Sequence, residues 1–261
     1  MARLKAASFD ERLTLVEHLD ELRTRIIFSG VFLVIVIAIC FWQDALLLDI
    51  ANDPIDDRQL ITLSPTEPFF TTVKLSIYAG ILITLPILLY QVYAFVLPAL
   101  APHEKKLVLP FLLSVPVLFI GGAAFAYFVV MPAALDFLLG FNQDEFNVQL
   151  RGSEYYGFFM LTLISVGILF QIPVAVLAVC RLGIVSPEQL AHNRRYAVLV
   201  IAIAAMLLPG TDPVTMLISM APLYLLFEFS LVLARAFGRP PDDAVDDADS
   251  VAADADTPAT T

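Results

Sequence analysis

The sequence has few charged residues and few of the residues that build catalytic or metal centres. Asp, Glu, Lys and Arg make up only 16% of its 261 residues, and it contains two cysteines and three histidines. A water-soluble domain of this length needs a more polar surface, so the composition excludes an ordinary soluble globular protein. Cys40 and Cys180 lie in separate apolar stretches and indicate neither a disulfide nor a zinc site.

Motifs for covalent chemistry are also missing. His18, His103 and His192 lack the spacing of a zinc protease helix, and the chain contains neither a G-x-S-x-G elbow nor a glycine-rich phosphate loop. The sequence therefore indicates no catalytic nucleophile. We therefore expect a protein that is not an enzyme and that carries no metal and no cofactor.

Apolar residues dominate what is present. They form 59% of the chain, and mean hydropathy is +0.82. Uncharged stretches at 26–43, 75–102, 107–135 and 155–180 are near or above the roughly 20 residues that a helix needs to cross a bilayer. The stretches at 196–208 and 214–227 are shorter, which leaves open a re-entrant hairpin instead of two further spans.

The sequence therefore predicts an all-α integral membrane protein with six helical spans, and four spans plus a hairpin is the alternative. The expected membrane domain covers residues 1–239, with spans at about 26–43, 69–97, 107–131, 155–180, 196–208 and 214–234.

Basic residues alternate between the two sides of this arrangement. Segments 1–25, 103–106, 181–195 and 235–261 hold most of the 15 Lys and Arg residues, whereas Arg58 and Arg151 are the bases of the intervening loops. By the positive-inside rule both chain ends are cytoplasmic. Residues 240–261 are acidic and poor in apolar side chains, so we expect a disordered cytoplasmic tail, and nucleic acid is not an expected partner.

A few polar side chains fall near or within the spans, where they are costly and become functional candidates. Lys74 suits a snorkelling position at the outer interface. Gln171 needs a partner for its amide, either another helix of the same chain or a bound protein. Glu228 lies seven residues before Arg235 on about the same helix face, so these two are expected to pair. Prolines in or near the spans should bend their helices.

The segment "HLDELRTRII" at 18–27 mixes acids with bases immediately before the first span. On a helix, Glu21 and Arg25 are one turn apart, but such pairs contribute only about 0.2 to 0.5 kcal/mol each. Helix stabilisation is therefore a weak reason for keeping acids there. Glu104 lies in a second short segment on the same side, and two carboxylates near the bilayer could bind an arginine-containing partner.

Several ordered motifs carry a resemblance to a known family. The motifs are "HLDELRTRII", "PFFTTVKL" (68–75), "LYQVYAFVLPAL", "HEKKLVLP", "FAYFVVMPAALDF" (125–137), "FQIPVAV" (170–176) and "GIVSPEQL" (183–190). With these motifs the chain resembles the TatC family, the multispanning subunit of the twin-arginine protein translocase, along nearly its whole length up to the tail. The resemblance implies six spans, the last two short, in a curved, glove-like bundle.

The resemblance also assigns roles. Glu21 and Glu104 match the acidic positions that recognise the twin-arginine motif of a signal peptide, and Leu22, Arg23 and Phe95 match the motifs around them. Met206 and Leu207 match the face offered to single-span subunits of TatA and TatB type, and Gln171 stands where the family often has Glu. Roles that are structural or functional are implied for four further positions: Pro54, Phe69, Tyr127 and Asp212.

The implied function is a translocase subunit in the plasma membrane of a prokaryote, part of a larger complex and itself homo-oligomeric. It recognises the leaders of folded precursors and nucleates the translocon, with the proton-motive force as the implied energy source. A small-solute transporter that uses Gln171 and Glu228 is the alternative, although no internal repeat is visible. A purely structural membrane scaffold is a further alternative.

Overall fold

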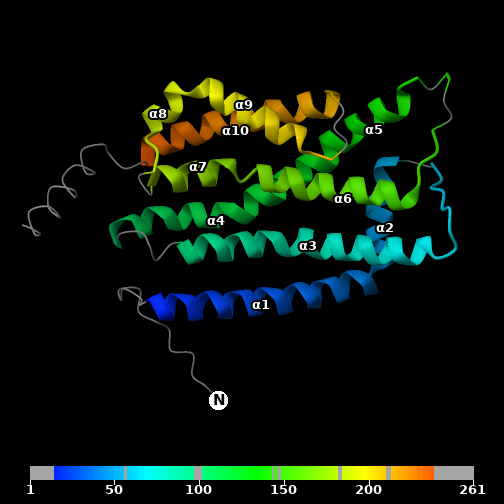
Figure 1. Cartoon of the computed structure of the whole chain (residues 1–261), viewed down its shortest axis with the longest axis horizontal. Helices are drawn as coiled ribbons and strands as arrows, with labels where there is room; N and C mark the ends of the chain where they lie inside the picture. Colours follow the sequence, from blue (N-terminus) through cyan, green and yellow to red (C-terminus); the bar gives the residue numbers. More distant parts are fainter. Residues whose placement is uncertain are drawn as a thin grey trace, which may run out of the picture.

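The computed structural model of the chain is a bundle of helices that run roughly parallel to one axis (Figure 1). It describes the backbone of residues 15–55, 58–96, 102–142, 144–145, 148–181, 184–209 and 213–237; within these ranges it does not describe the side chains of 15–19, 94, 96, 102–113, 181 and 236–237. The predicted acidic tail lies outside the described residues.

Long helices form from the apolar stretches. Their bounds are α1 Leu15–Trp42, α3 Glu67–Val96, α4 Pro102–Phe125, α5 Met131–Gly140, α6 Gly152–Leu169, α7 Ile172–Arg181, α9 Arg194–Met206 and α10 Pro213–Phe237. Shorter elements are α2 Asp44–Asn52, η1 Asp53–Ile55, the π-helical segment η3 Ala126–Val130 and α8 Pro187–His192. Among the described residues no sheet forms, and Ile61 and Arg151 make one isolated bridge.

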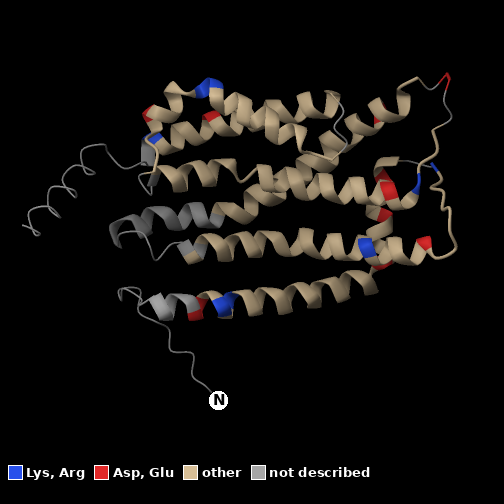
Figure 2. Cartoon of the chain, in the orientation of Figure 1, with Lys and Arg blue, Asp and Glu red and all other residues tan. Residues whose placement is uncertain are grey.

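Five segments of the described chain are long and apolar enough to cross a membrane. They are Asp20–Trp42, Glu67–Tyr93, Ser114–Gly140, Gly152–Cys180 and Pro213–Arg235. In Figure 2 the middles of the helices are mostly tan, and most Lys, Arg, Asp and Glu residues of the described part of the chain lie toward the two ends. The chain is therefore an integral membrane protein of the all-α class.

The last two helices differ from each other in length. The 13 residues of α9 would cover only about 20 Å, so this helix is short, as expected. In contrast, α10 runs for 25 residues through Pro222 and Glu228. The end of α9 and the start of α10 both lie short of the far ends of α3 and α6 (Figure 1). The sixth span therefore stays a prediction.

The ends of the bundle can be named from the chain. We call the end at which α1 begins and α10 ends the inner end, and the opposite end, where α1 meets α2, the outer end (Figure 1). At one edge α1 packs on α3, and α3 in turn packs on α4 and α6. Toward the other edge α10 packs on both α7 and α9.

Two glycines allow α4 and α6 to approach closely. A Cβ at Gly167 would meet the ring of Phe119 at 2.8 Å, and one at Gly122 would meet Phe170 at 2.7 Å. Phe119 and Phe159 are among the largest fully buried side chains of this core. In lipid, such close backbone approach is a main source of helix association.

Proline determines where two of the helices change course. Pro173 lacks an N–H and its ring clashes with the carbonyl four residues earlier, which is that of Leu169, where α6 ends. The π-helical segment η3 likewise ends at Val130, just before Met131 and Pro132. The chain departs from regular α-helix at both prolines, as expected, whereas Pro86 and Pro222 lie inside the uninterrupted helices α3 and α10.

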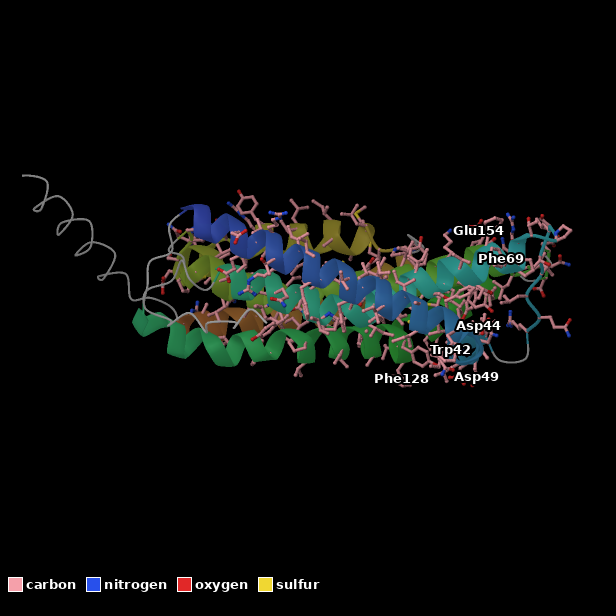
Figure 3. The ribbon with its side chains drawn as sticks, turned by 90° about the horizontal axis from the view of Figure 1, so that it is seen from below. Trp42, Asp44, Asp49, Phe69, Phe128 and Glu154 are labelled. Carbon is pink, nitrogen blue, oxygen red and sulfur yellow. The ribbon has the colours of Figure 1, made fainter. Side chains whose placement is uncertain are left out.

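The outer end carries exposed aromatic side chains from three elements. Trp42, Phe69 and Phe128 are 85%, 61% and 73% exposed and lie toward the same end of the molecule (Figure 3). Lys74 lies over the ring of Tyr78, 5.9 Å from its centroid, which suits the expected interfacial position. Aromatic and snorkelling side chains of this kind mark the boundary between hydrocarbon and water.

Labelling at the turn between α9 and α10 tests the six-span prediction. An Asp212→Cys variant should react in intact cells with a membrane-impermeant maleimide, because six spans place this turn outside the cell. Arg195→Cys, near the start of α9, should stay unlabelled and is the matched control. The native Cys40 and Cys180 are buried and give little background. An unreactive Asp212→Cys chain would support the hairpin instead.

Candidate functional site

Glu21 on α1 is bound to a guanidinium of its own chain. Arg25, one turn later, donates from Nε and Nη2 to Glu21 Oε1 at 2.9 and 2.5 Å. Its Nη1 donates to Gln91 Oε1 on α3 at 2.5 Å. The spacing predicts the first contact, and the second joins α1 to α3 at the inner end.

The Glu21–Arg25 pair is accessible to water. Their side chains are 28% and 27% exposed, respectively. Helical i,i+4 pairs in such positions contribute only about 0.2 to 0.5 kcal/mol, and exposed pairs in general about 0.2 to 1 kcal/mol. The carboxylate is thus partly shielded by protein, and its pairing with Arg25 is of the weak kind that exposed helical ion pairs form.

The other residues of the expected recognition surface lie on helices at the same end. Leu22 and Phe95 are half-buried, and Arg23 is exposed. Glu104 is in the first turn of α4, but its side chain lies outside the described residues. Because α3 packs on both α1 and α4, the two acids come from helices that flank α3 at the inner end (Figure 1).

Gln171 lies in the break between α6 and α7. It is only 4% exposed, and its Nε2 donates to the carbonyl of Val115 on α4 at 3.1 Å. Its Oε1 has no hydrogen-bond partner among the residues that the structure describes. The amide therefore links two helices of the same chain, which is one of the two roles left open by the sequence.

Met206 and Leu207 lie at the end of α9 and face away from the bundle. They are 56% and 80% exposed and continue an apolar face of the helix that includes Leu199, Val200 and Ile203. This surface is separate from Gln171, whose side chain is buried. The structure thus does not place the three expected partner-binding residues on a single exposed surface.

Glu228 is paired, but the expected partner was wrong. Its Oε2 lies 3.1 Å from Nη2 of Arg194, the first residue of α9, and its Oε1 accepts from the hydroxyl of Tyr224 at 2.8 Å. Two helical turns separate Glu228 from Arg235, about 10 Å along the axis, whereas α9 packs directly beside α10. The pair therefore ties α9 to α10.

Two tyrosines at the outer end bind the end of α2 and the start of η1. The Tyr127 hydroxyl lies 3.1 Å from the carbonyl of Ile50 and 2.9 Å from Oδ2 of Asp53. The hydroxyl of Tyr155 donates to the Ala51 carbonyl at 2.5 Å. These contacts satisfy carbonyls at the end of α2 that have no partner within the helix. They give Tyr127 a structural role.

Pro54 and Phe69, the next expected positions, lie at the same end. Pro54 is half-buried in η1, and Phe69 is exposed in the first turn of α3. Asp212 lies outside the described residues.

Glu67 connects three parts of the outer end. It is 8% exposed and accepts from Arg151 Nε and Ser153 Oγ, both at 2.7 Å, and from the backbone N–H of Leu63 at 2.8 Å. The hydrogen bond to Glu67 raises the pKa of Arg151 above its ordinary value, so the guanidinium stays charged. We call Glu67, Arg151 and Ser153 the outer latch.

Among the described residues no group of three or more His, Cys, Asp or Glu side chains could hold a metal ion. The candidate residues instead form ion pairs, one buried amide link and exposed apolar faces.

Comparison with known proteins identifies the family. The family model for "Sec-independent protein translocase protein (TatC)" matches residues 17–222. The chain belongs to the TatC family. The TatC of Koribacter versatilis is 37% identical over 85% of both chains, and that of Aquifex aeolicus is 39% identical over 87% of this chain and 97% of its own.

A solved structure supports the same conclusion. The crystal structure of the twin-arginine translocase receptor TatC in the detergent DDM is 37% identical, covers 86% of this chain and all of its own, and has a TM-score of 0.73. The chain is therefore a TatC-type protein translocase subunit. The findings favour this function over a small-solute transporter.

Some residues of this TatC chain were not singled out from the sequence. Gln91, Glu67 and Arg194 each bind a residue far away in the chain, and Glu67 and Arg151 are 84 residues apart. Of these residues, Glu67 is the one that the sequence could have indicated. It lies directly before the motif "PFFTTVKL", and a carboxylate in the first turn of a helix interacts favourably with the positive end of the helix dipole.

The outer latch predicts an unequal effect of two similar substitutions. Glu67→Gln should lower the Tm of the purified chain in detergent, because the neutral amide cannot form the ion pair that Glu67 makes with Arg151. Glu154→Gln is the matched control, since Glu154 is 80% exposed and lies 3.9 Å from Arg151. Thermal unfolding with both variants checks this. Equal Tm values for the two variants would contradict the latch.

Proposed function

We propose that this TatC chain recognises twin-arginine signal peptides at its inner end, and that the inner end faces the cytoplasm of a prokaryote. The carrying observation is that the half-buried carboxylate of Glu21 already binds a guanidinium. Arginine presents a planar fork of donors that fits a carboxylate, whereas lysine presents a point charge. A surface that holds one guanidinium in this way suits the arginines of a leader.

A second carboxylate is needed for the second arginine, and Glu104 is the proposed one. The start of α4 lies at the same end as the start of α1, with α3 between them (Figure 1). In this proposal Leu22, Arg23 and Phe95 form the surface between the two acids, and Phe95 offers an apolar contact. Recognition here is binding and assembly, without a covalent step.

The single-span subunits of TatA and TatB type are the proposed partners of α9. Its exposed apolar face reaches Met206 and Leu207, and an apolar helix in lipid can pack there by shape. Gln171 would join only if a partner reached the break between α6 and α7, where its Oε1 could accept a hydrogen bond. As an amide it does not titrate, so no charge change can occur there.

Photo-crosslinking tests the proposed recognition surface. A photoreactive residue in place of Glu104 should still crosslink to a twin-arginine precursor, because Glu21 remains to hold one arginine of the leader beside this position. The yield should fall at least about tenfold with a twin-lysine precursor, which loses bidentate pairing. Crosslinks are read by gel mobility of the labelled precursor.

The matched control places the same photoreactive residue at Arg195, also near the inner end but on α9. It should give few crosslinks with either precursor. Equal yields with the twin-arginine and twin-lysine precursors at position 104 would refute the assignment of this surface.

A further inference from the structure

The group that Glu21 binds in this structure is chemically the same as the group that its proposed ligand carries. Arg25 supplies a guanidinium from within α1, and two of its N–H groups reach the carboxylate. This inference rests on the proposed role of Glu21 in binding a leader's arginine. If that role is correct, the resting chain holds a competitor in its own binding site.

The geometry of the internal pair leaves room for a better ligand. Both N–H groups of Arg25 converge on one oxygen, Oε1, from the same helix. An external arginine is not tethered to α1, so it can approach the carboxylate with two parallel N–H groups, the stronger arrangement. The partial exposure of both side chains gives the incoming group access.

Gln91 offers a hydrogen-bond acceptor to Arg25 after its displacement from Glu21. Its Oε1 already accepts from Nη1 of Arg25 across the contact between α1 and α3. When Arg25 leaves Glu21, this bond can persist, so its guanidinium keeps a partner near the membrane. Without Gln91 the displaced charge would have only water and neighbouring carboxylates.

We propose that Arg25 occupies the Glu21 site in the resting chain, and that an incoming leader arginine displaces it toward Gln91. Arg25 is thus an internal placeholder that lowers the apparent affinity for every leader. Its effect follows population arithmetic: the apparent dissociation constant rises as the fraction of chains with an open site falls.

The placeholder makes a specific prediction about selectivity. The Glu21–Arg25 pair must break before any leader binds Glu21. Removal of this pair should therefore increase the affinity for twin-arginine and twin-lysine leaders by the same factor. The ratio between the two affinities should therefore stay constant. A residue that merely shaped the carboxylate for arginine would change this ratio when replaced.

Binding of labelled leader peptides to the full chain in detergent tests the proposal. Arg25→Gln should tighten binding of a twin-arginine peptide about two- to fivefold, the range expected for loss of an exposed ion pair. Arg25→Lys, which cannot reach both Glu21 and Gln91 with a planar fork, should give a smaller gain. Fluorescence anisotropy of the peptide provides the dissociation constants.

Two further variants complete the design. Arg195→Gln removes one positive charge near the same end without touching Glu21 and should leave binding unchanged, which excludes a general electrostatic effect. Gln91→Leu should change peptide binding less than Arg25→Gln does, because the Arg25–Gln91 bond is present both before and after displacement. Any effect of Gln91→Leu should vanish in combination with Arg25→Gln, which would show that Gln91 acts through Arg25.

The outcomes separate this inference from the proposed function. If Glu21→Gln leaves twin-arginine binding unchanged, the proposed recognition site itself is wrong. If Glu21→Gln weakens binding but Arg25→Gln and Arg25→Lys both leave it unchanged or weaken it, the site stands and the placeholder is overturned. Tighter binding of both peptides to Arg25→Gln, at a constant ratio, supports the placeholder.

Discussion

The absence of water in the hydrocarbon core is the constraint on which this structure depends. A charge or amide within the bundle must find its partner in the protein, because lipid offers none. The buried amide of Gln171 meets this need through its hydrogen bond to the Val115 carbonyl. Toward the ends of the bundle, the Glu67–Arg151 and Glu228–Arg194 pairs, each with a partly exposed arginine, join different elements of the chain and so help to hold the bundle together.

The two ends of the bundle differ in how their charged side chains are bound. At the outer end Glu67 is nearly buried and receives three donors, while the tyrosines Tyr127 and Tyr155 bind the end of α2. At the inner end Glu21 pairs with Arg25, and both side chains remain partly exposed. The outer end is thus held by several hydrogen bonds to nearly buried groups, whereas the proposed exchange of Arg25 requires the partial exposure of the inner pair.

Much of the fold could be predicted from the sequence, because the length of an apolar stretch and the position of a proline determine helix formation within the same segment of the chain. Helices α1 and α3 form around the uncharged stretches that begin at Ile26 and Leu75, and the break before Pro173 follows from its missing N–H. The Glu21–Arg25 contact follows from helical spacing. Family motifs supplied the identity, since many ordered segments rarely match by chance.

Contacts between distant parts of the chain could not be predicted in this way. Gln91 meets Arg25 across 66 residues, and neither has a periodic pattern that points to the other. Glu228 was assigned to Arg235 on its own helix, whereas its partner, Arg194, lies on the neighbouring one. Helical spacing describes one surface of a helix, but the side chains opposite it depend on the packing of the whole bundle.

Charge exchange between receptor and leader tests the central claim most directly, which is that carboxylates at the inner end pair with a leader's arginines. A Glu21→Arg, Glu104→Arg chain should lose binding of a twin-arginine leader and gain binding of a leader that carries two glutamates. Binding of the twin-arginine leader by this doubly reversed chain at native strength would contradict the account.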